Sequence, residues 1–305
     1  MNISHPNIIY HILAQSDYPT ILNICQFDPD ITNLCNTNNL FKQLILDKRV
    51  DHYIQESPNI NMALIRAAIN GDSFLVNELI TRGADPSTDD NTAIRIASQK
   101  GHLDVVDRLL EDQRVDPAAK NNEAIRRASF NGYLDVVNRL LEDSRVDPSS
   151  THNAAIRRAS EKGHLNVVDR LLEDPRVNPS DGNNFAMLDA AENGHLDVVN
   201  RLLQDPRYNP NFPNDADIIR TSEQGYTDVV DLLLQHPLVD PAIHNNYAII
   251  IASQNGHLSV VNRLLQDPRV NPSAQDNLAL TSAQENNHID IVNRLLQDPR
   301  VQQNL

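Results

Sequence analysis

The sequence predicts an all-α protein: a solenoid of eight helix–turn–helix units behind a short N-terminal head of three helices. The main observation is a stretch that recurs along the chain, and its clearest copy is Gly101-His-Leu-Asp-Val-Val-Asp-Arg-Leu-Leu-Glu-Asp112. Related copies begin at Gly71, Gly132, Gly163, Gly194, Gly225, Gly256 and Asn287. The steps between them are 30 residues once and 31 thereafter. Self-similarity at a fixed period of this length is the signature of a repeat solenoid.

The charge of the 305-residue chain narrows the choice of partners. A formal net charge of −15 argues against nucleic acid and anionic membrane surfaces, because both require clustered Lys and Arg. No signal peptide is visible, and no apolar run is long enough to cross a bilayer. We therefore expect a cytoplasmic protein that does not bind membranes.

The two cysteines lie within apolar helical patterns. Cys25 and Cys35 are ten residues apart, and neither belongs to a CxxC motif or a Cys/His cluster. We expect both to be buried thiols in a reducing compartment.

Each copy is expected to contain two antiparallel helices, as the second copy, residues 91–117, illustrates. Asn91 is placed to cap the first helix, because its side chain can accept from free backbone N–H groups. Ala93 and Ala97 fall four residues apart on one face, where small side chains let neighbouring helices approach closely. Gly101 ends this helix with positive φ. The second helix follows with an apolar stripe of Leu103, Val106, Leu109 and Leu110.

This unit of helix, glycine turn, helix and extended loop resembles the ankyrin repeat. The stretch Gly-His-Leu-x-Val-Val-x-x-Leu-Leu matches that family closely, and Ala93-Ile94-Arg95 stands where the family has Pro-Leu-His. The resemblance covers residues 59–301 in eight copies, and it implies a stack of helix pairs that binds partner proteins. The family's other turn glycine is replaced mostly by Asn and Asp, which tolerate the left-handed region best after glycine. These replacements are Asp90, Asn121, His152, Asn183, Asn214, Asn245 and Asp276.

Residues 1–55 carry no clear repeat and are expected to form a head, with the solenoid over residues 56–305. Apolar residues at helical spacing predict three short helices there. The head resembles an F-box, whose apolar residues dock on the Skp-type adaptor of a cullin ubiquitin ligase. His5 replaces the usual leucine of that family, and its usual tryptophan is missing. The resemblance assigns the adaptor contact or the fold of the head to Pro6, Ile9, Ile12, Leu13, Leu22 and Phe41.

An alternative interpretation is that the head only caps the repeats. The stretch Leu44–Asp51 echoes Leu109–Asp116, so residues 31–51 also read as a degenerate zeroth copy. A repeat stack needs end units with a polar outer face. The two interpretations differ in one observable. A cap should leave Ile9 and Leu13 buried, whereas an F-box should leave part of that stripe open.

Two sets of polar residues recur with the period and are expected to be structural. His102, His164, His195, His257 and His288 each follow the turn glycine. They recur once per unit without Cys or carboxylate partners, so we expect turn packing and inter-repeat hydrogen bonds rather than a metal site. The Asp112/Arg114 pair and Arg108 also recur. They are expected to form ion pairs along the convex side, each contributing under about 1 kcal/mol if exposed.

Residues that differ between copies are better candidates for binding a target. Five arginines concentrate positive charge on the first helices of copies two to four, where an acidic segment of a partner is a candidate ligand. They are Arg95, Arg126, Arg127, Arg157 and Arg158. The alternative is that each replaces the family's structural histidine and bonds to a neighbouring loop.

A second candidate site consists of aromatic residues in copies five to seven. Phe185 and Tyr247 occupy equivalent positions, and Phe212 lies in the loop between them. Exposed aromatics close together are typical of interface hot spots. The alternative is that the rings cover an imperfectly stacked layer, because the sixth copy is the most irregular. Its departures are Asp217 and Thr221 for alanine, Leu232 for arginine, and His236-Pro-Leu238 for Asp-Pro-Arg.

No enzyme motif is present, so we expect no catalysis, no cofactor and no metal site. The sequence predicts a monomeric adaptor whose repeats capture a target protein and whose head recruits a Skp/cullin ubiquitin ligase. The alternative is a plain binding scaffold whose N-terminal helices only cap the stack. An F-box-like head followed by short, Asn-rich repeats is similar to the ankyrin proteins of giant viruses of amoebae.

Overall fold

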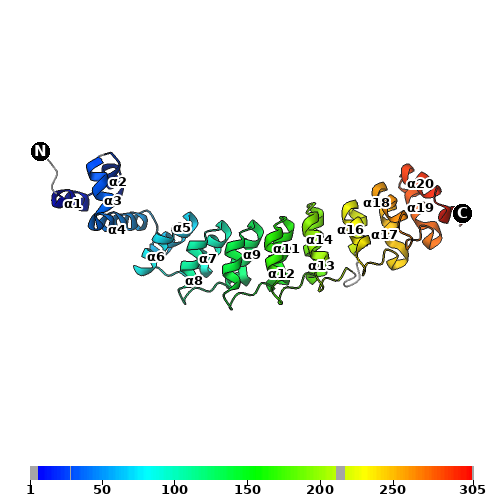
Figure 1. Cartoon of the computed structure of the whole chain (residues 1–305), viewed down its shortest axis with the longest axis horizontal. Helices are drawn as coiled ribbons and strands as arrows, with labels where there is room; N and C mark the ends of the chain where they lie inside the picture. The colour runs from blue at the N-terminus through cyan, green and yellow to red at the C-terminus, as the bar shows by residue number, and fades with distance from the viewer. Residues whose placement is uncertain (1–5, 28, 211–216, 304–305) are drawn as a thin grey trace. The chain divides into compact units, whose positions relative to one another are not determined.

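The computed structural model describes residues 6–27, 29–210 and 217–303, and every regular element in these ranges is a helix (Figure 1). Contacts divide the chain into two compact units, Met1–Ala119 and Lys120–Leu305. The boundary expected between residues 55 and 56 falls inside the first unit. Within the described ranges, no helix combines the length and apolar character needed to span a bilayer.

The first unit contains α1 to α8. Their bounds are α1 Pro6–Gln15, α2 Tyr18–Phe27, α3 Pro29–Thr37, α4 Asn39–Gln55, α5 Ile60–Asn70, α6 Ser73–Thr81, α7 Thr88–Lys100 and α8 Leu103–Leu110. The remaining helices are α9 Ala119–Asn131, α10 Leu134–Leu141, α11 Ser150–Glu161, α12 Leu165–Leu172, α13 Asp181–Glu192, α14 Leu196–Leu203, α15 Asp217–Gln224, α16 Thr227–Gln235, α17 Ile243–Gln254, α18 Leu258–Leu265, α19 Ala274–Glu285, α20 Ile289–Leu296 and α21 Pro299–Gln302.

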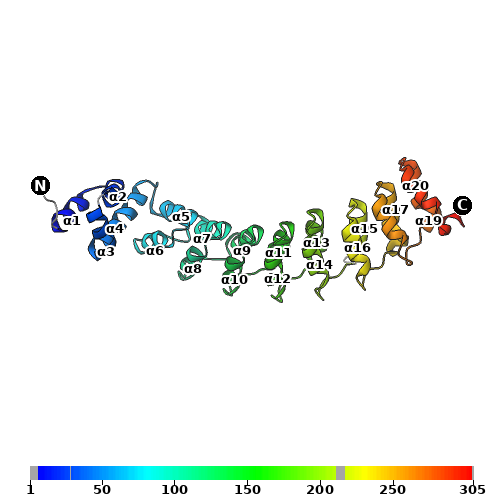
Figure 2. The same ribbon diagram turned by 45° about the horizontal axis from the view of Figure 1, so that its top comes forward.

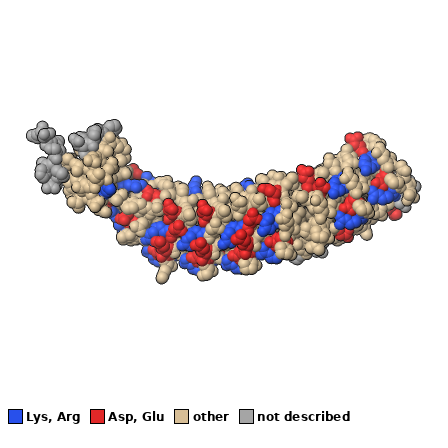
Figure 3. Space-filling model, viewed as in Figure 1, with Lys and Arg blue, Asp and Glu red and all other residues tan. Residues whose placement is uncertain are grey.

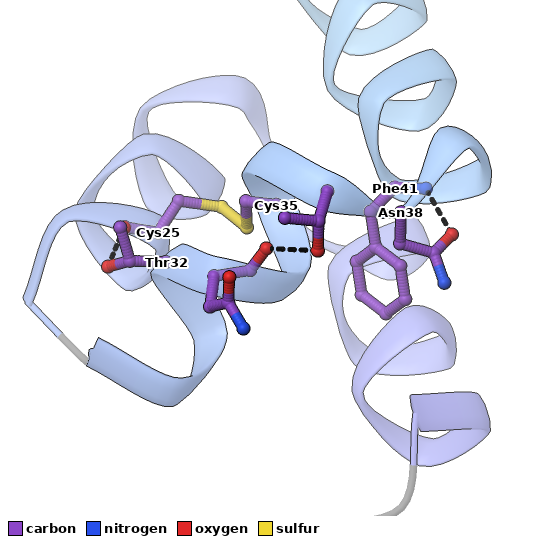
Figure 4. The surroundings of a disulfide bond; sticks show 7 residues. Cys25, Thr32, Cys35, Asn38 and Phe41 are labelled. Atoms are coloured by element: carbon purple, nitrogen blue, oxygen red, sulfur yellow. Dashed lines mark hydrogen bonds between the residues drawn. A yellow bond between two sulfur atoms is a disulfide. The ribbon is translucent and has the colours of Figure 1, made fainter.

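The head has a small apolar core of its own. Ile9, Leu13, Ile21 and Phe41 are buried together. The side chain of Asn38 accepts from the backbone N–H of Phe41 at 3.4 Å and so caps α4 (Figure 4). The three short helices expected from the sequence are α1, α2 and α3, and α4 is a longer fourth helix.

A disulfide joins α2 to α3. The sulfur atoms of Cys25 and Cys35 are bonded (Figure 4), so the prediction of two free thiols is wrong. The Thr32 hydroxyl donates to the Cys25 carbonyl oxygen at 2.6 Å and ties the same two helices together. The sequence did not indicate this pairing, because it depends on how tightly α2 turns back on α3.

The long helix α4 is attached to the first helix pair by ion pairs. Arg82 of the segment after α6 reaches Asp51 at 2.7 Å and Asp47 at 2.9 Å. Arg49 of α4 pairs in turn with Asp72, which caps α6. The charged residues of Leu44–Asp51, the stretch of α4 that resembles the repeat, therefore contact the α5/α6 helix pair.

Six of the first helices contain a left-handed turn just after their first residue. In α7 the residues Asp89, Asp90 and Asn91 have φ angles of 54°, 53° and 61° before the right-handed helix continues. The same three-residue pattern occurs in α9, α11, α13, α17 and α19. The predicted left-handed residues are confirmed at Asp90, Asn121, His152, Asn183, Asn245 and Asp276, while Asn214 lies outside the described residues.

The recurring asparagine after this turn does not cap its own helix. The side-chain oxygen of Asn91 instead accepts from the backbone N–H of Asp116 at 2.8 Å. It therefore anchors the loop that follows the second helix, 25 residues further along the chain. Equivalent bonds join Asn122 to Asp147, Asn153 to Asn178 and Asn246 to Asn271. The helix-cap prediction for this position is wrong, because these residues have left-handed backbone and their oxygens face a distant loop.

In the second unit the helix pairs form layers with two rows of helices. First helices α11, α13, α15, α17 and α19 pack on one another in sequence, and second helices α10 to α20 do the same. Figure 2 shows both rows, with α11, α13 and α15 above α12, α14 and α16. The predicted apolar stripe of α8 is buried in part: Val106 and Leu109 are buried, whereas Leu103 and Leu110 are partly exposed. Val105, which was not predicted, is buried with them.

The glycine and histidine of the repeated stretch form one contact between layers. Gly163 has a φ of 71°, and a Cβ atom built on it would lie 2.5 Å from the ring of His195 in the next layer. The position therefore requires glycine for its backbone and for the space. In other copies the histidine ring forms a hydrogen bond with a carbonyl oxygen of the preceding layer, as between His164 and Phe130 at 3.0 Å. Inter-repeat hydrogen bonds are thus confirmed for His102, His164, His257 and His288, and packing against the turn glycine is confirmed for His195.

Candidate protein-binding surfaces

A recurring arginine links consecutive second helices. Arg201 of α14 donates to the Asp169 carboxylate of α12 at 2.6 Å, and Arg170 of α12 donates to the Asn138 side chain of α10 at 2.9 Å. Arg294 makes the same bond to Asn262 at 2.9 Å. Each such arginine reaches back by one layer, so the set forms a ladder along one row of helices.

A second arginine links the loop of one layer to the helix end of the layer before it. Arg207 donates to the carbonyl oxygens of Leu172 at 2.6 Å and Val177 at 2.9 Å. The buried carboxylate of Asp205 holds the guanidinium in place, and this hydrogen bond keeps the pKa of Asp205 below its ordinary value. The expected ion pair is present, but its arginine also satisfies a carbonyl group left free at the C-terminus of α12 and another in the loop that follows.

The α15/α16 layer lacks all three links to the layer before it. Tyr226 stands where five other copies have histidine, and among the described residues none beyond the chain neighbours of Gly194 would approach a Cβ on it within 4 Å. Leu232 replaces the ladder arginine, and Leu238 replaces the loop arginine. Leu238 is 58% exposed. The sixth copy is therefore irregular at the positions that hold the other layers together.

A buried polar cluster stands at this junction instead. The Tyr208 hydroxyl donates to the carboxylate of Asp217, and the Asn184 side chain donates to it at 2.9 Å. Asp217 is 0% exposed, and burial raises its pKa to about 7. Sequence reasoning identified Asp217 as irregular but missed Tyr208. The sequence does mark Tyr208 as unusual, because the same position in other copies is valine: Val146, Val177, Val239 and Val270.

Two of the predicted target-binding arginines bond to their own left-handed turns. Arg95 donates to the carbonyl oxygen of Asp90 at 3.0 Å, and Arg126 donates to that of Asn121 at 3.0 Å. Burial lowers the pKa of Arg126. These contacts match the alternative in which arginine replaces the structural histidine and bonds to a loop.

The other three arginines have carboxylate partners within the chain. Arg127 pairs with Glu123 at 2.6 Å, and Arg158 pairs with Glu161 at 2.7 Å. Arg157 pairs with Asp189 of the next layer at 2.5 Å. An acidic partner would have to compete with these internal carboxylates, so a role for the five arginines in target binding stays a prediction.

The predicted aromatic residues are exposed where the structure describes them. Phe185 is 37% exposed, and its ring lies between the guanidinium groups of Arg157 at 4.5 Å and Arg220 at 5.9 Å. A Cβ atom on Gly182 would lie 2.7 Å from this ring, so glycine makes room for it. Tyr247 is also exposed, two layers further on. Phe212 lies outside the described residues.

A hollow lies between the fifth and sixth copies on the first-helix side. Its volume is about 270 Å³, and its lining includes Leu188 and Glu192 of α13, Arg220 of α15 and Tyr226. Arg220 contributes both to this hollow and to the Phe185 ring. Phe185 itself does not line the hollow, and Arg220 is the residue that connects the two features.

The head residues divide into buried and exposed groups. Ile9, Leu13 and Phe41 are buried in the head's own core. Ile12 is 45% exposed and Leu22 is 40% exposed. Pro6 is the first residue of α1. The burial of Ile9 and Leu13 is the outcome expected of a cap, while Ile12 and Leu22 leave part of the apolar surface open.

The layered helix pairs and their loops define a repeat protein of the kind that binds other proteins. A family model described as ankyrin repeats (3 copies) matches residues 32–121, 123–214 and 218–304. The chain therefore belongs to the ankyrin-repeat family, and its repeats indicate a scaffold for protein–protein interaction. The first match begins within α3 and includes α4, so it extends into the segment expected to form the head.

Proposed function

We propose that the protein is a non-catalytic binding scaffold that holds a target protein on its first helices, near Phe185 and Tyr247. The exposed Phe185 ring between two guanidinium groups carries this proposal. An aromatic ring fixed in this way offers a large contact area at little cost in side-chain entropy. The surrounding arginines are already paired, so the proposed target contributes apolar groups rather than a strongly acidic segment.

Replacing Phe185, Phe212 and Tyr247 together with alanine tests this proposal. The full chain is used as bait, and the retained proteins are measured by quantitative mass spectrometry. We expect the specific partners to be lost while the thermal unfolding midpoint stays close to that of the wild type. Tyr133→Ala removes an exposed aromatic outside this set and serves as the matched control. Retention of the same partners by the triple variant would reject this surface.

A second candidate function is recruitment of a Skp-type adaptor of a cullin ubiquitin ligase by the head. The exposed Ile12 and Leu22 favour it, because F-box contacts are apolar. The chain would then act by proximity, raising the effective concentration of a target beside the ligase. Burial of Ile9 and Leu13 and a family match that begins at residue 32 favour the simple cap, which we therefore place first.

A binding assay between the purified adaptor and the full chain separates these two functions. The adaptor interpretation predicts retention by the wild type and loss in Ile12→Asp/Leu22→Asp. Both side chains are exposed, so this variant should keep its fold. No retention by the wild type would leave only the scaffold function.

The proposed cytoplasmic location is open to a direct test through the head. Disulfides are rare in the reducing cytosol, and the structure contains the Cys25–Cys35 bond. Thiol alkylation in intact cells followed by mass spectrometry should find both cysteines modified if the protein is cytoplasmic. Unmodified, bonded cysteines would indicate an oxidising compartment.

A further inference from the structure

We propose that the row of second helices carries a notch between α14 and α16 that binds an arginine side chain of a partner protein. The notch consists of Leu196, Asp197 and Asn200 of α14 with Asp228, Asp231 and Leu232 of α16. The inference rests on the proposed function as a protein-binding scaffold. It adds a surface on the row of helices that does not contain Phe185.

The notch lies at the position of a missing ladder arginine. In the preceding layer Arg201 reaches back to Asp169 at 2.6 Å. In the following layer Arg263 reaches back to Asp231. Leu232 occupies the same position in α16 and is too short and apolar to bond to the exposed side chain of Asn200. The neighbouring layers thus show which side chain the local surface is shaped to hold.

The walls of the notch suit the two ends of an arginine. The hollow has a volume of about 420 Å³ and is lined by Leu196, Asp197, Asn200, Asp228, Asp231 and Leu232. Arginine can lay its aliphatic stem on apolar surface while its charged group stays among polar groups. Leu196, which is exposed, and Leu232 supply the apolar surface, and the carboxylates and Asn200 supply the acceptors.

Charge selects a cation over an anion at this place. Asp231 is already paired with Arg263, but Asp197 and Asp228 form no ion pair within the described part of the chain. No Lys or Arg lines the hollow. Figure 3 shows Lys and Arg alternating with Asp and Glu over the repeats, the pattern that the ladder pairs produce. A guanidinium can donate to two acceptors at once, whereas a carboxylate ligand would meet repulsion.

The overall charge agrees with the local charge. The chain carries a net charge of −15, which favours encounter with basic partners. The arginines on the first helices are engaged internally, so they do not oppose this preference. The proposed ligand is therefore a segment of a protein with an arginine beside an aliphatic residue.

The experiment uses the full-length chain and a display library of short random peptides as the probe. Leu232→Arg fills the notch with the chain's own arginine, which can reach Asn200 as Arg201 reaches Asp169. We expect peptides selected on the wild type to share an arginine next to an aliphatic residue. Their Kd should rise by at least about tenfold on L232R. Ser259→Arg adds the same charge at an exposed position of α18 outside the notch and should keep the Kd within about threefold.

A charge-free copy of the ligand completes the test. Citrulline replaces the selected arginine with a neutral side chain of nearly the same shape, and binding should weaken by about tenfold. Selected peptides that bind wild type and L232R equally would overturn the notch. If peptides that bind the wild type and L232R equally lose binding to the Phe185, Phe212 and Tyr247 variant, the proposed scaffold function stands and the notch proposal falls. Enrichment of acidic peptides would also overturn the notch, and a library without any binder would contradict both proposals.

Discussion

The α13/α14 and α15/α16 layers share one two-helix plan but are joined to their predecessors by different groups. The α13/α14 layer uses His195 against Gly163, Arg201 against Asp169 and Arg207 against free carbonyl groups. The α15/α16 layer has lost the residue that makes each of these contacts. Its junction is held by the buried Tyr208–Asp217–Asn184 cluster instead.

This difference separates the residues that stack the repeats from the residues that can bind a partner. A recurring side chain that bonds to the neighbouring layer stabilises the stack and is not available to a partner. Where the same position carries leucine, the acceptors of the preceding layer and an apolar surface remain exposed. The irregular copy therefore lacks the recurring links and leaves acceptors of the preceding layer exposed. The following variants break or restore individual links, beginning with the largest expected effect.

The buried cluster should make stability depend on pH. Burial raises the pKa of Asp217 to about 7 from an ordinary value of 3.8. Between these two pH values the unfolded chain releases a proton that the folded chain retains, so the free energy of unfolding falls as pH rises. Asp217→Asn removes this effect. At pH 8 it should exceed the wild type in stability by up to about 4 kcal/mol, with little difference near pH 4.

Urea unfolding of both proteins across this pH range checks the prediction. Tyr208→Phe provides a graded variant, because it removes a hydrogen bond that lowers the Asp217 pKa. Its loss of stability with pH should extend to higher pH than in the wild type. Identical pH profiles for the wild type and D217N would contradict the assigned role of this carboxyl group.

Two glycines with similar backbone conformation should respond differently to alanine. Gly163 and Gly194 have φ angles of 71° and 76°, but only Gly163 has a histidine ring against it. Gly194→Ala should cost about 1–2 kcal/mol, the strain of a left-handed residue. Gly163→Ala should cost about 2 kcal/mol more, because the ring of His195 must also move. Chemical denaturation measures both, and His195→Ala should close most of the gap between them.

Removing the loop arginine should lower the free energy of unfolding by more than introducing one in the next layer should raise it. Arg207→Leu removes three bonds to carbonyl oxygens and leaves the Asp205 carboxylate buried, so we expect a loss of about 2–3 kcal/mol. Leu238→Arg with His236→Asp rebuilds the pair in the next layer and should gain about 1 kcal/mol. Thermal unfolding of the two variants compares them. A destabilised double replacement would show that the irregular loop has a different geometry.

The ladder arginine should have the smallest effect. Arg201→Leu should destabilise the chain by about 0.5–1 kcal/mol, since the pair with Asp169 is partly exposed. Leu232→Arg should stabilise it by a similar amount through a new bond to Asn200. Measured in the same buffer, the two changes should have opposite signs, and a loss of stability in L232R would argue against an intact acceptor at this place.

Local regularity explains how much of this fold could be predicted from the sequence. The period, the glycine turn, the left-handed Asn and Asp residues and the histidine contacts all follow from what every copy shares. The role of Asn91 could not be predicted, because its partner Asp116 is distant in sequence and meets it only in the folded layer. The Cys25–Cys35 bond similarly depends on how α2 and α3 pack.

The candidate surfaces were predictable only in part. Substitutions such as Leu232 and Asp217 are visible when copies are aligned, and Phe185 was recognised as an exposed aromatic. What each substitution does depends on the residue it faces. Asn200 matches the recurring pattern in the sequence and becomes unusual only because the arginine that would reach it is missing. Tyr208 and Asp217 are individually odd replacements, and only their contact explains why both are present.

Amide hydrogen exchange of the full chain tests the central claim most directly. If the recurring links hold the regular layers, amides of α15 and α16 should exchange faster than those of α11 to α14. A peptide with an arginine beside an aliphatic residue, selected on the wild type, should then slow exchange in α14 and α16 and have no such effect in L232R. Uniform exchange along the second unit, or protection by the peptide only at other helices, would contradict the account.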